Sequence, residues 1–495
     1  MYLQCNEVHT RRLKHENALP PGPPKKTSCS LCLCGEIPPC SLYLSVASLR
    51  YRSTLADFSH AVQNATCMKI FDLRAGQSAQ SEGVFSRRYL PDSNIINRVA
   101  AILAEVRQRR DNALIEFAQR FDRATLQPGE LPVTQEEIER ANAQLDPAFA
   151  EALLAAQANI RECASVGKRT GWRERNAQGA IVGEHFDPLR RIGIYVPAGT
   201  APLVSTAVMT ASLAKVAGVP EIVVTTPVGP TKTINSSLLA ALHLAGATEI
   251  YKVGGAQGIA ALAFGTETIR LVYKIFGPGN AYVTEAKRQV FGYVAVDLMP
   301  GPSEILIIAD ESAEPRWIAA DLLAQAEHGR DSVIGFIALA EPLIERVQEE
   351  IAIQIESLKR KAYLHEVLEK NAFCVLATSE KQAARIANEF APEHLSLMTQ
   401  HNEEIAASVT TAGAVFIGNF SPVAAGDFVA GPSHVLPTGG AGKSFSGLTV
   451  DQFQRRTSYI CYDRDALEKS VSIVSQFSSV EQLDGHGRSV AIRFE

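Results

Sequence analysis

Beyond Gly193, short apolar runs alternate along the chain with Ala- and Leu-rich stretches of helical character. The clearest apolar runs are 222–226, 249–253, 304–309 and 333–338. Strands buried on both faces of a parallel sheet have such continuous apolar runs, and the helices between them supply the crossovers. The sequence therefore predicts an α/β fold with two parallel-sheet layers, one from 192 to 303 and one from 304 onward.

The segment before these layers has helix signals. Asp92 and Ser93 can cap a helix that runs toward Phe117, and Thr134 with Glu137 forms a capping-box pattern that opens a second long helix. We therefore expect the part up to about residue 194 to be mainly helical.

Charge and hydropathy exclude two classes of partner. The 495 residues include 48 basic and 53 acidic side chains, for a net charge of −5. This balance gives no electrostatic reason to expect a nucleic acid. The longest uncharged stretch, 192–214, is interrupted by Pro197 and Pro202, so no membrane-spanning helix is predicted.

The first 67 residues differ from the rest. They carry a Pro-rich run and six of the nine cysteines: Cys5, Cys29, Cys32, Cys34, Cys40 and Cys67. Cys29 and Cys32 form a CxxC pair without a second pair, which favours a structureless extension over a zinc knuckle. Two interpretations stay open: an organellar transit peptide, or a start codon upstream of a true start at Met68. If the true start is Met68, the protein is expected to be cytoplasmic. If the extension is a transit peptide, the protein is expected in a plastid or other organelle.

Three Gly-rich loops follow expected strands, at 193–199, 254–257 and 277–280. Ligands of open parallel sheets bind at the carboxyl ends of the strands, and glycines there let the backbone approach a ligand closely. Tyr195, Gln257 and Asn280 would face that ligand, although each loop alone also fits ordinary turn chemistry. None has the GxGxxG fingerprint. The segment 439–444 resembles a P-loop, but Pro437 stands at the required first glycine.

Polar residues in the second half suggest a metal site. Gln325 and His328 are three residues apart at the end of an expected helix that starts near Pro315, so they share one face. Further candidates sit in or beside Gly- or Pro-bounded turns: Glu393, His394, Asp427, His434, Glu481 and His486. Each histidine alone also fits a surface or core role.

Five segments, in order, resemble the histidinol dehydrogenase family: GPSEILIIAD, DLLAQAEHGRDS, APEHL, AAGDFVAGPSHVLPT and EQLDGHG. The resemblance extends from Met68 to the end. It implies two incomplete Rossmann-like domains in an intertwined homodimer. The implied domains are a helical part at 68–194, an NAD-contacting domain at 195–303, a domain with metal and acid/base residues at 304–447, and a dimer-exchanging segment at 448–495.

The resemblance also implies roles for individual residues. One zinc ion per subunit would be held by Gln325, His328, Asp427 and His486, the last from the partner subunit. Glu393 and His394 would be the acid/base pair. Substrate contacts would fall on Ser303, His394, His434 and Glu481 together with the metal ligands, and NAD contacts on Tyr195, Gln257 and Asn280.

The implied reaction oxidises L-histidinol to L-histidine through a bound aldehyde with two NAD. Two alternatives remain: a related dehydrogenase of another small alcohol such as a sulfonated diol, and a zinc-stabilised binding protein without turnover. Manganese or cobalt would also suit the N/O ligand set. Two segments depart from the family pattern, Pro197-Ala198-Gly199 near the expected cofactor and Pro432-Ser433 before His434.

Overall fold

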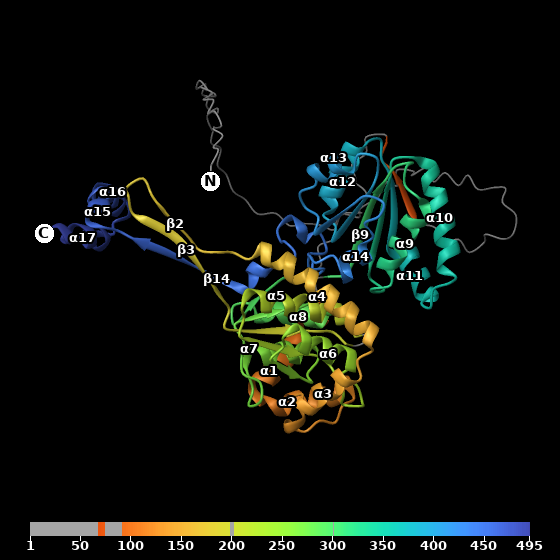
Figure 1. Cartoon of the computed structure of the whole chain (residues 1–495), viewed down its shortest axis with the longest axis horizontal. Coiled ribbons are helices and arrows are strands. Elements are labelled where there is room, and N and C mark those ends of the chain that lie inside the picture. The colour runs from red at the N-terminus through yellow and green to blue at the C-terminus, as the bar shows by residue number, and fades with distance from the viewer. Residues whose placement is uncertain (1–67, 75–91, 199–201, 300) are drawn as a thin grey trace, which may run out of the picture. The chain divides into compact units, whose positions relative to one another are not determined.

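The computed structural model describes residues 68–74, 92–198, 202–299 and 301–495. The expected extension 1–67 lies outside this range. The described residues form two parallel sheets and a small antiparallel sheet, with helices packed around them (Figure 1). The predicted α/β class with two parallel sheets is therefore confirmed. Within the described ranges, no helix is both long and apolar enough to cross a membrane.

The first parallel sheet has five strands in the order β6-β5-β4-β7-β8. Its strands are β4 (Arg191–Tyr195), β5 (Glu221–Thr225), β6 (Glu249–Tyr251), β7 (Lys274–Phe276) and β8 (Ala295–Val296). Its helices are α5 (Val204–Ala217), α6 (Ser236–Ala245), α7 (Gly255–Phe264) and α8 (Ala281–Val290). The chain starts in the middle at β4 and moves outward in both directions, so the strand order reverses between β4 and β7, where open sheets bind ligands.

The second parallel sheet has six strands in the order β1-β11-β10-β9-β12-β13. Its strands are β1 (Lys69–Asp72), β9 (Glu304–Ala309), β10 (Val333–Ala338), β11 (Ala372–Leu376), β12 (His394–Met398) and β13 (Ala414–Ile417). Its helices are α9 (Pro315–Ala326), α10 (Glu341–Ile355), α11 (Lys361–Asn371), α12 (Glu380–Phe390), α13 (Asn402–Ser408) and α14 (Val423–Phe428). Ile305 and Ile307 of β9 pack into one core and Leu306 and Ile308 into another, so the sheet is covered on both faces.

The helices before the first sheet are α1 (Ser93–Arg109), α2 (Asp111–Phe117), α3 (Gln135–Ala143) and α4 (Pro147–Gly167). Asp92 caps α1, and the Thr134 capping box forms as predicted. The prediction of a single helix that reaches Phe117 is wrong, because the helix is interrupted at Arg110, whose φ is 50°. The break lets buried Asp111 bond to the loop before β7: its carboxylate accepts a hydrogen bond from the Thr268 hydroxyl at 2.6 Å.

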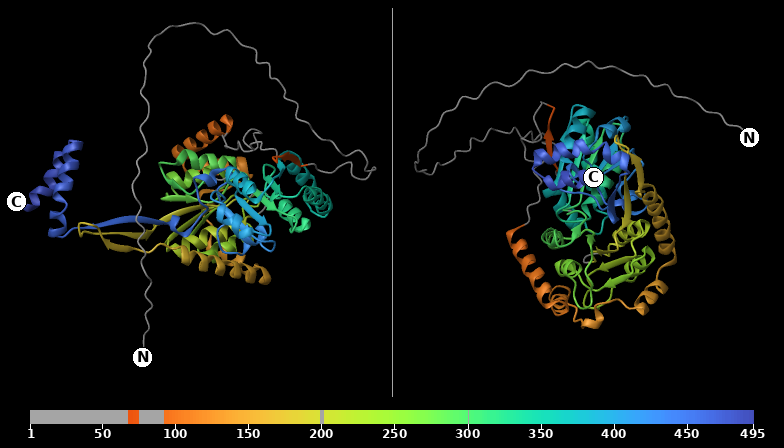
Figure 2. Two further views of the ribbon diagram at one scale, coloured as in Figure 1. Left: turned by 90° about the horizontal axis from the view of Figure 1, so that it is seen from above. Right: turned by 90° about the vertical axis from the view of Figure 1, so that its left-hand side faces the viewer.

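The antiparallel sheet has the order β14-β3-β2 and carries the C-terminal helices. Its strands are β2 (Trp172–Arg175), β3 (Ile181–Pro188) and β14 (Gln454–Cys461). The helices α15 (Arg464–Glu468), α16 (Val471–Glu481) and α17 (Asp484–Ala491) follow β14. They lie at the end of this sheet that is farther from α9 and α14 (Figures 1 and 2, blue). The C-terminal segment is thus an arm rather than part of either parallel-sheet core.

Candidate active site

Glu393 and His394 lie where β12 begins, beside the first residue of β9. The Glu304 backbone N–H donates to Glu393 Oε2 at 2.8 Å. His394 Nδ1 lies 2.9 Å from the Glu304 carbonyl oxygen. A carbonyl only accepts, so Nδ1 must carry a proton, and in the neutral ring Nε2 is the basic nitrogen. Among the described residues, no hydrogen-bond partner is found for this buried Nε2. His394 is therefore oriented as a proton acceptor.

Asp427, from α14, lies between two imidazoles. Its Oδ1 is 3.7 Å from His394 Nε2, and its Oδ2 is 3.8 Å from His328 Nε2. His328 follows α9, which begins at Pro315 as predicted. The last turn of α9 also holds Gln325, which is 1% exposed and has no described partner for its Nε2. One amide, one carboxylate and two imidazoles thus belong to this site.

Burial disfavours the charged form of the side chains at this site. It lowers the pKa of His394 to about 4 and also lowers the pKa of His328. It raises the pKa of Asp427 to about 6. Burial, followed by the nearby carboxyls of Glu304 and Asp427, raises the pKa of Glu393 well above its usual value. A divalent cation would reverse the shift at Asp427 and would keep His328 neutral, because it favours deprotonated ligands.

The expected zinc ligands Gln325, His328 and Asp427 come from the end of α9 and from α14. Across the described ranges, no group of three or more His, Cys, Asp or Glu side chains is arranged to hold a metal ion. The buried Gln325, in the turn of α9 before His328, together with the His328 and Asp427 pair nevertheless fits a divalent cation, since amide oxygen, imidazole and carboxylate are ligands that zinc accepts.

The three expected NAD-contact residues lie at the carboxyl edge of the five-stranded sheet. Tyr195 ends β4, and its hydroxyl accepts a hydrogen bond from Gly255 N at 3.2 Å. Gln257 is in the first turn of α7, and Asn280 caps α8 by accepting from Tyr282 N at 3.1 Å. Burial raises the pKa of the Tyr195 phenol to about 12, so it stays protonated.

A glycine brings two of these loops together. Gly277 has a φ of +108°, and a Cβ there would lie 2.2 Å from the Tyr195 carbonyl oxygen. Only glycine allows this approach. The N-termini of α7 and α8 therefore point to one edge, where their backbone N–H groups favour an anion such as a pyrophosphate.

A family model described as histidinol dehydrogenase matches residues 85–494. The chain belongs to the histidinol dehydrogenase family. A histidinol dehydrogenase of Heliobacterium mobile is 40% identical over 418 residues, which are 84% of this chain and 98% of the relative. That of Geobacillus kaustophilus is 43% identical over 415 residues, or 83% and 97% of the two chains. The crystal structure of the Elizabethkingia anophelis histidinol dehydrogenase superposes with a TM-score of 0.83 at 33% identity, covering 86% of this chain and 98% of that one.

The predicted family and function are thus confirmed: this histidinol dehydrogenase is an NAD-dependent oxidoreductase of histidine biosynthesis. The family uses NAD and zinc and acts on histidinol. Its two expected sets of site residues lie on different sheets. The NAD contacts follow the carboxyl ends of strands, whereas Glu393 directly precedes β12 and His394 is its first residue, at the amino end of that strand. The second set thus lies at the strand end opposite to the one expected for ligands of open parallel sheets.

His434, which is expected to contact the substrate, makes two hydrogen-bond contacts within the chain. Its Nδ1 lies 2.8 Å from the Asp427 backbone oxygen, and its Nε2 lies 3.3 Å from the Thr206 hydroxyl. Both ring nitrogens are engaged within the chain. His434 therefore supports Asp427 and connects it to α5. Ser303, by contrast, is half-buried directly before Glu304, beside the acid/base pair.

Glu481 and His486 of this histidinol dehydrogenase are not brought to the other ligands within one chain. Glu481 ends α16 and His486 lies in α17, both exposed on the C-terminal arm. The arm also exposes an apolar face on α16. Ile473, Phe477 and Val480 are 44%, 65% and 82% exposed, at the spacing of one helical face.

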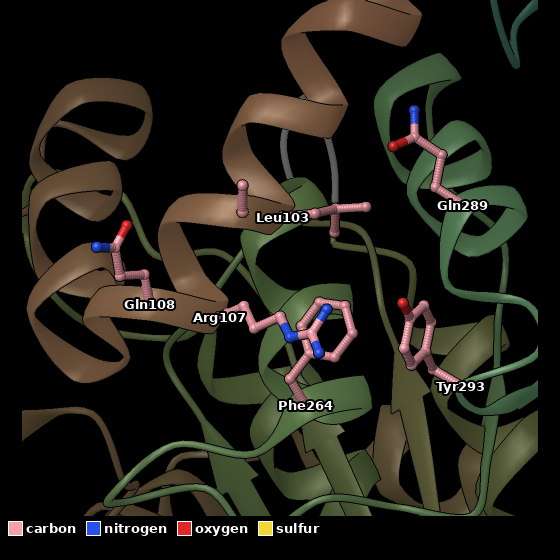
Figure 3. Close-up of a pocket in the computed structure, with 7 residues that line it drawn as sticks. Leu103, Arg107, Gln108, Phe264, Gln289 and Tyr293 are labelled. Carbon is pink, nitrogen blue, oxygen red and sulfur yellow. The ribbon is translucent and has the colours of Figure 1, made fainter.

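The pocket in Figure 3 is separate from these sites. It has a volume of about 480 Å³ and is lined by residues of α1, α7 and α8 and by Tyr293. The Arg107 guanidinium lies over the rings of Phe264 and Tyr293, at 5.7 and 5.4 Å from their centroids. None of the expected site residues of the histidinol dehydrogenase lines it.

Sequence reasoning missed Glu304, which touches both acid/base residues. A signal was present, because a glutamate heads an otherwise apolar strand. It also missed Thr206, which had no signal, since only the fold brings α5 to His434.

Proposed function

We propose that this enzyme oxidises L-histidinol to L-histidine in two steps through an aldehyde that stays bound, with one NAD consumed in each step. The observation that carries this proposal is the buried His394 ring, whose Nδ1–H is fixed on the Glu304 carbonyl, with the Glu393 carboxyl 3.6 Å from Nδ1, and whose Nε2 is left as a base that faces Asp427. Two adjacent proton-transfer groups of different chemistry suit two successive oxidations.

In the first step, His394 Nε2 takes the proton of the substrate hydroxyl as the carbinol carbon loses hydride. The low pKa that burial gives this ring keeps it neutral before the reaction, so its lone pair is available. The resulting imidazolium lies beside the Asp427 carboxylate, which stabilises it, and the proton is then released to solvent.

In the second step, Glu393 takes a proton from the water that adds to the aldehyde. The hydrate then loses hydride, and the carboxylate of histidine results. The raised pKa of Glu393 makes it a stronger base than an exposed glutamate whenever it is ionised. Tyr195, Gln257 and Asn280 would hold NAD, which would supply the hydride acceptor for each step.

Gln325, His328 and Asp427 would hold zinc together with His486 of the partner subunit. When bound, zinc provides a positive template for the imidazole and amine nitrogens of histidinol, and it favours the ionised carboxylates. Ser303 of the same chain and Glu481 of the partner subunit would hold the polar ends of the substrate. The chain would thus divide into the ranges expected from the sequence, with 195–303 for NAD, 304–447 for chemistry and 448–495 for exchange.

The exposed apolar face of α16 supports a homodimer. Burying the exposed side chains of Ile473, Phe477 and Val480 against another protein surface would be favourable. A second copy of the chain that binds this arm would also bind Glu481 and His486.

The test is a stoichiometric assay of the purified protein with histidinol and NAD, with and without a chelator. We expect two NADH formed per histidinol consumed, and loss of this activity with the chelator. A ratio of one would contradict the four-electron reaction and favour oxidation of another alcohol to its aldehyde.

A further inference from the structure

Glu304 places a carboxyl group where the fold expects an apolar side chain. It is the first residue of β9, a strand inside the six-stranded sheet in which all six residues are buried. Glu304 itself is 2% exposed. Burying a carboxyl group is unfavourable unless hydrogen bonds compensate for its lost hydration. Such a residue therefore needs a specific explanation.

The backbone of Glu304 holds both members of the acid/base pair. Its N–H donates to Glu393 Oε2 at 2.8 Å, and its carbonyl oxygen lies 2.9 Å from His394 Nδ1. These two bonds set the carboxyl orientation of Glu393 and the tautomer of His394. Any rotation of the peptide groups around Glu304 would change both bonds.

The side chain of Glu304 is itself anchored. Its Oε1 accepts a hydrogen bond from Gly439 N at 3.0 Å. Gly439 and Gly440 have φ values of 63° and 78°, so this turn requires glycine. The neighbouring Thr438 hydroxyl accepts a hydrogen bond from Gly301 N. The turn 437–440, in the segment that resembles a P-loop, thus holds the chain before β9 at two points.

We propose that Glu304 is a positioning residue: its carboxyl group, fixed by Gly439, holds the first peptide groups of β9 in the orientation that aligns Glu393 and His394. The inference rests on the proposed function for the roles of these two residues. Glu304 is the first residue of β9, so no earlier strand residue fixes its backbone by sheet hydrogen bonds. The hydrogen bond from Gly439 N to its carboxyl group restrains it instead.

Two substitutions separate anchoring from charge. Glu304→Gln keeps an oxygen that accepts from Gly439 N and removes the carboxylate charge. Glu304→Ala removes the acceptor. Ile308→Ala is the matched control, because Ile308 is also fully buried in β9 but touches the second core rather than Gly439. Glu304→Ala and Ile308→Ala both lower the melting temperature, so stability alone does not distinguish them.

We expect Glu304→Ala to lower kcat for both oxidations about 100-fold, with the KM for histidinol changed less than about threefold. Glu304→Gln should stay within about threefold of the wild type, and so should Ile308→Ala. The second readout is the Nδ1–H signal of His394 in protein labelled with ¹⁵N-histidine, assigned by its loss in His394→Asn. This signal should shift in Glu304→Ala and persist in Glu304→Gln and Ile308→Ala.

The proposal is overturned if Glu304→Ala leaves kcat and the signal unchanged, if Ile308→Ala loses as much kcat, or if Glu304→Gln loses as much as Glu304→Ala. Should Glu304→Ala fail to fold, Thr438→Val loosens the same turn by removing the acceptor for Gly301 N. It should shift the His394 signal, and an unchanged signal counts against the proposal. The signal is read without substrate or cofactor. A wild-type enzyme that fails to form two NADH per histidinol therefore contradicts only the proposed function.

Discussion

Asp427 Oδ1 lies 3.7 Å from His394 Nε2, so the carboxylate proposed to hold zinc also faces the nitrogen proposed to take the substrate proton. Binding of the ion and proton transfer thus share one side chain. A substitution at either residue has to be tested for both effects.

Replacing His394 with Asn should abolish the first oxidation while leaving zinc bound. Loss of a general base lowers kcat by roughly 10² to 10⁴. The measurement is the initial rate of NADH formation from histidinol, together with the zinc content of the protein. His401→Asn is the control, since His401 is exposed and bonded to Glu380. Turnover at the wild-type rate in the His394 variant would remove this residue from the role of base.

Replacing Glu393 with Gln should slow oxidation of histidinaldehyde more than oxidation of histidinol. The amide still accepts from Glu304 N, so His394 keeps its position, but it cannot take a proton from water. Single-turnover rates with each substrate under the same conditions measure the two steps. Equal losses in both would contradict the division of labour between Glu393 and His394.

Mixed dimers test whether active sites are shared. A hybrid of a His394→Asn chain and a His486→Ala chain contains one intact site if His486 acts across the interface. Random reassortment of equal amounts should then recover about a quarter of the wild-type activity. Formation of hybrids is checked with two affinity tags. Hybrids that form without any recovery would show that each chain builds its own site.

The buried ion pair of Arg191 should make stability depend on pH below 5. Arg191 is 4% exposed and bonds to Glu249 at 2.6 Å. Hydrogen bonding to Arg191 lowers the pKa of Glu249 from 4.5 to about 2. Because the pKa of Glu249 is lower in the folded than in the unfolded protein, its ionisation stabilises the fold at pH values above 4.5. This stabilisation is lost as the pH falls from 4.5 to 2. The contribution at pH 7 is about 2 to 3 kcal/mol.

Glu249→Gln should therefore be less stable than the wild type at pH 7, with a difference that shrinks as the pH approaches 2. Urea unfolding at several pH values measures it. Glu105→Gln removes the exposed pair with Arg109 and serves as the control, with little effect at any pH. A stability difference for Glu249→Gln that stays constant from pH 7 to pH 2 would contradict the role of its ionisation.

Removing residues 1–67 should leave catalysis intact, because every proposed site residue lies beyond Met68. The kcat and KM of a chain that begins at Met68 should match those of the full chain within about twofold. A folded but inactive short chain would show that the extension contributes to the site.

Local signals in the sequence gave reliable predictions. The Thr134 capping box and the start of α9 at Pro315 depend on neighbouring residues alone, and both form. The apolar runs predicted parallel strands, because a strand buried on both faces has no other pattern. The break at Arg110 was missed, since it depends on a bond between Asp111 and Thr268, which lie far apart in sequence.

Positions that depend on strand pairing were harder to predict. The register of β9 against β12 sets Glu304 beside Glu393, and no local pattern encodes that register. Tyr195 lies at the carboxyl end of its strand, as expected for a ligand contact of an open parallel sheet, whereas His394 lies at the amino end of its strand. In the second sheet the end of α9 delivers Gln325 to the amino ends of the strands instead.

The bonds from Thr206 through His434 to the backbone of Asp427 have a mechanical consequence. Helix α5 packs on the sheet that carries the expected cofactor loops, whereas Asp427 belongs to the part with the acid/base pair. The imidazole ring of His434 lies between them and contacts Thr206 of α5 on one side and the Asp427 backbone on the other. Movement of one sheet against the other would therefore act through the His434 ring on the backbone that carries the Asp427 carboxylate, so this ring is one of the contacts through which the expected cofactor part and the expected acid/base part respond to each other.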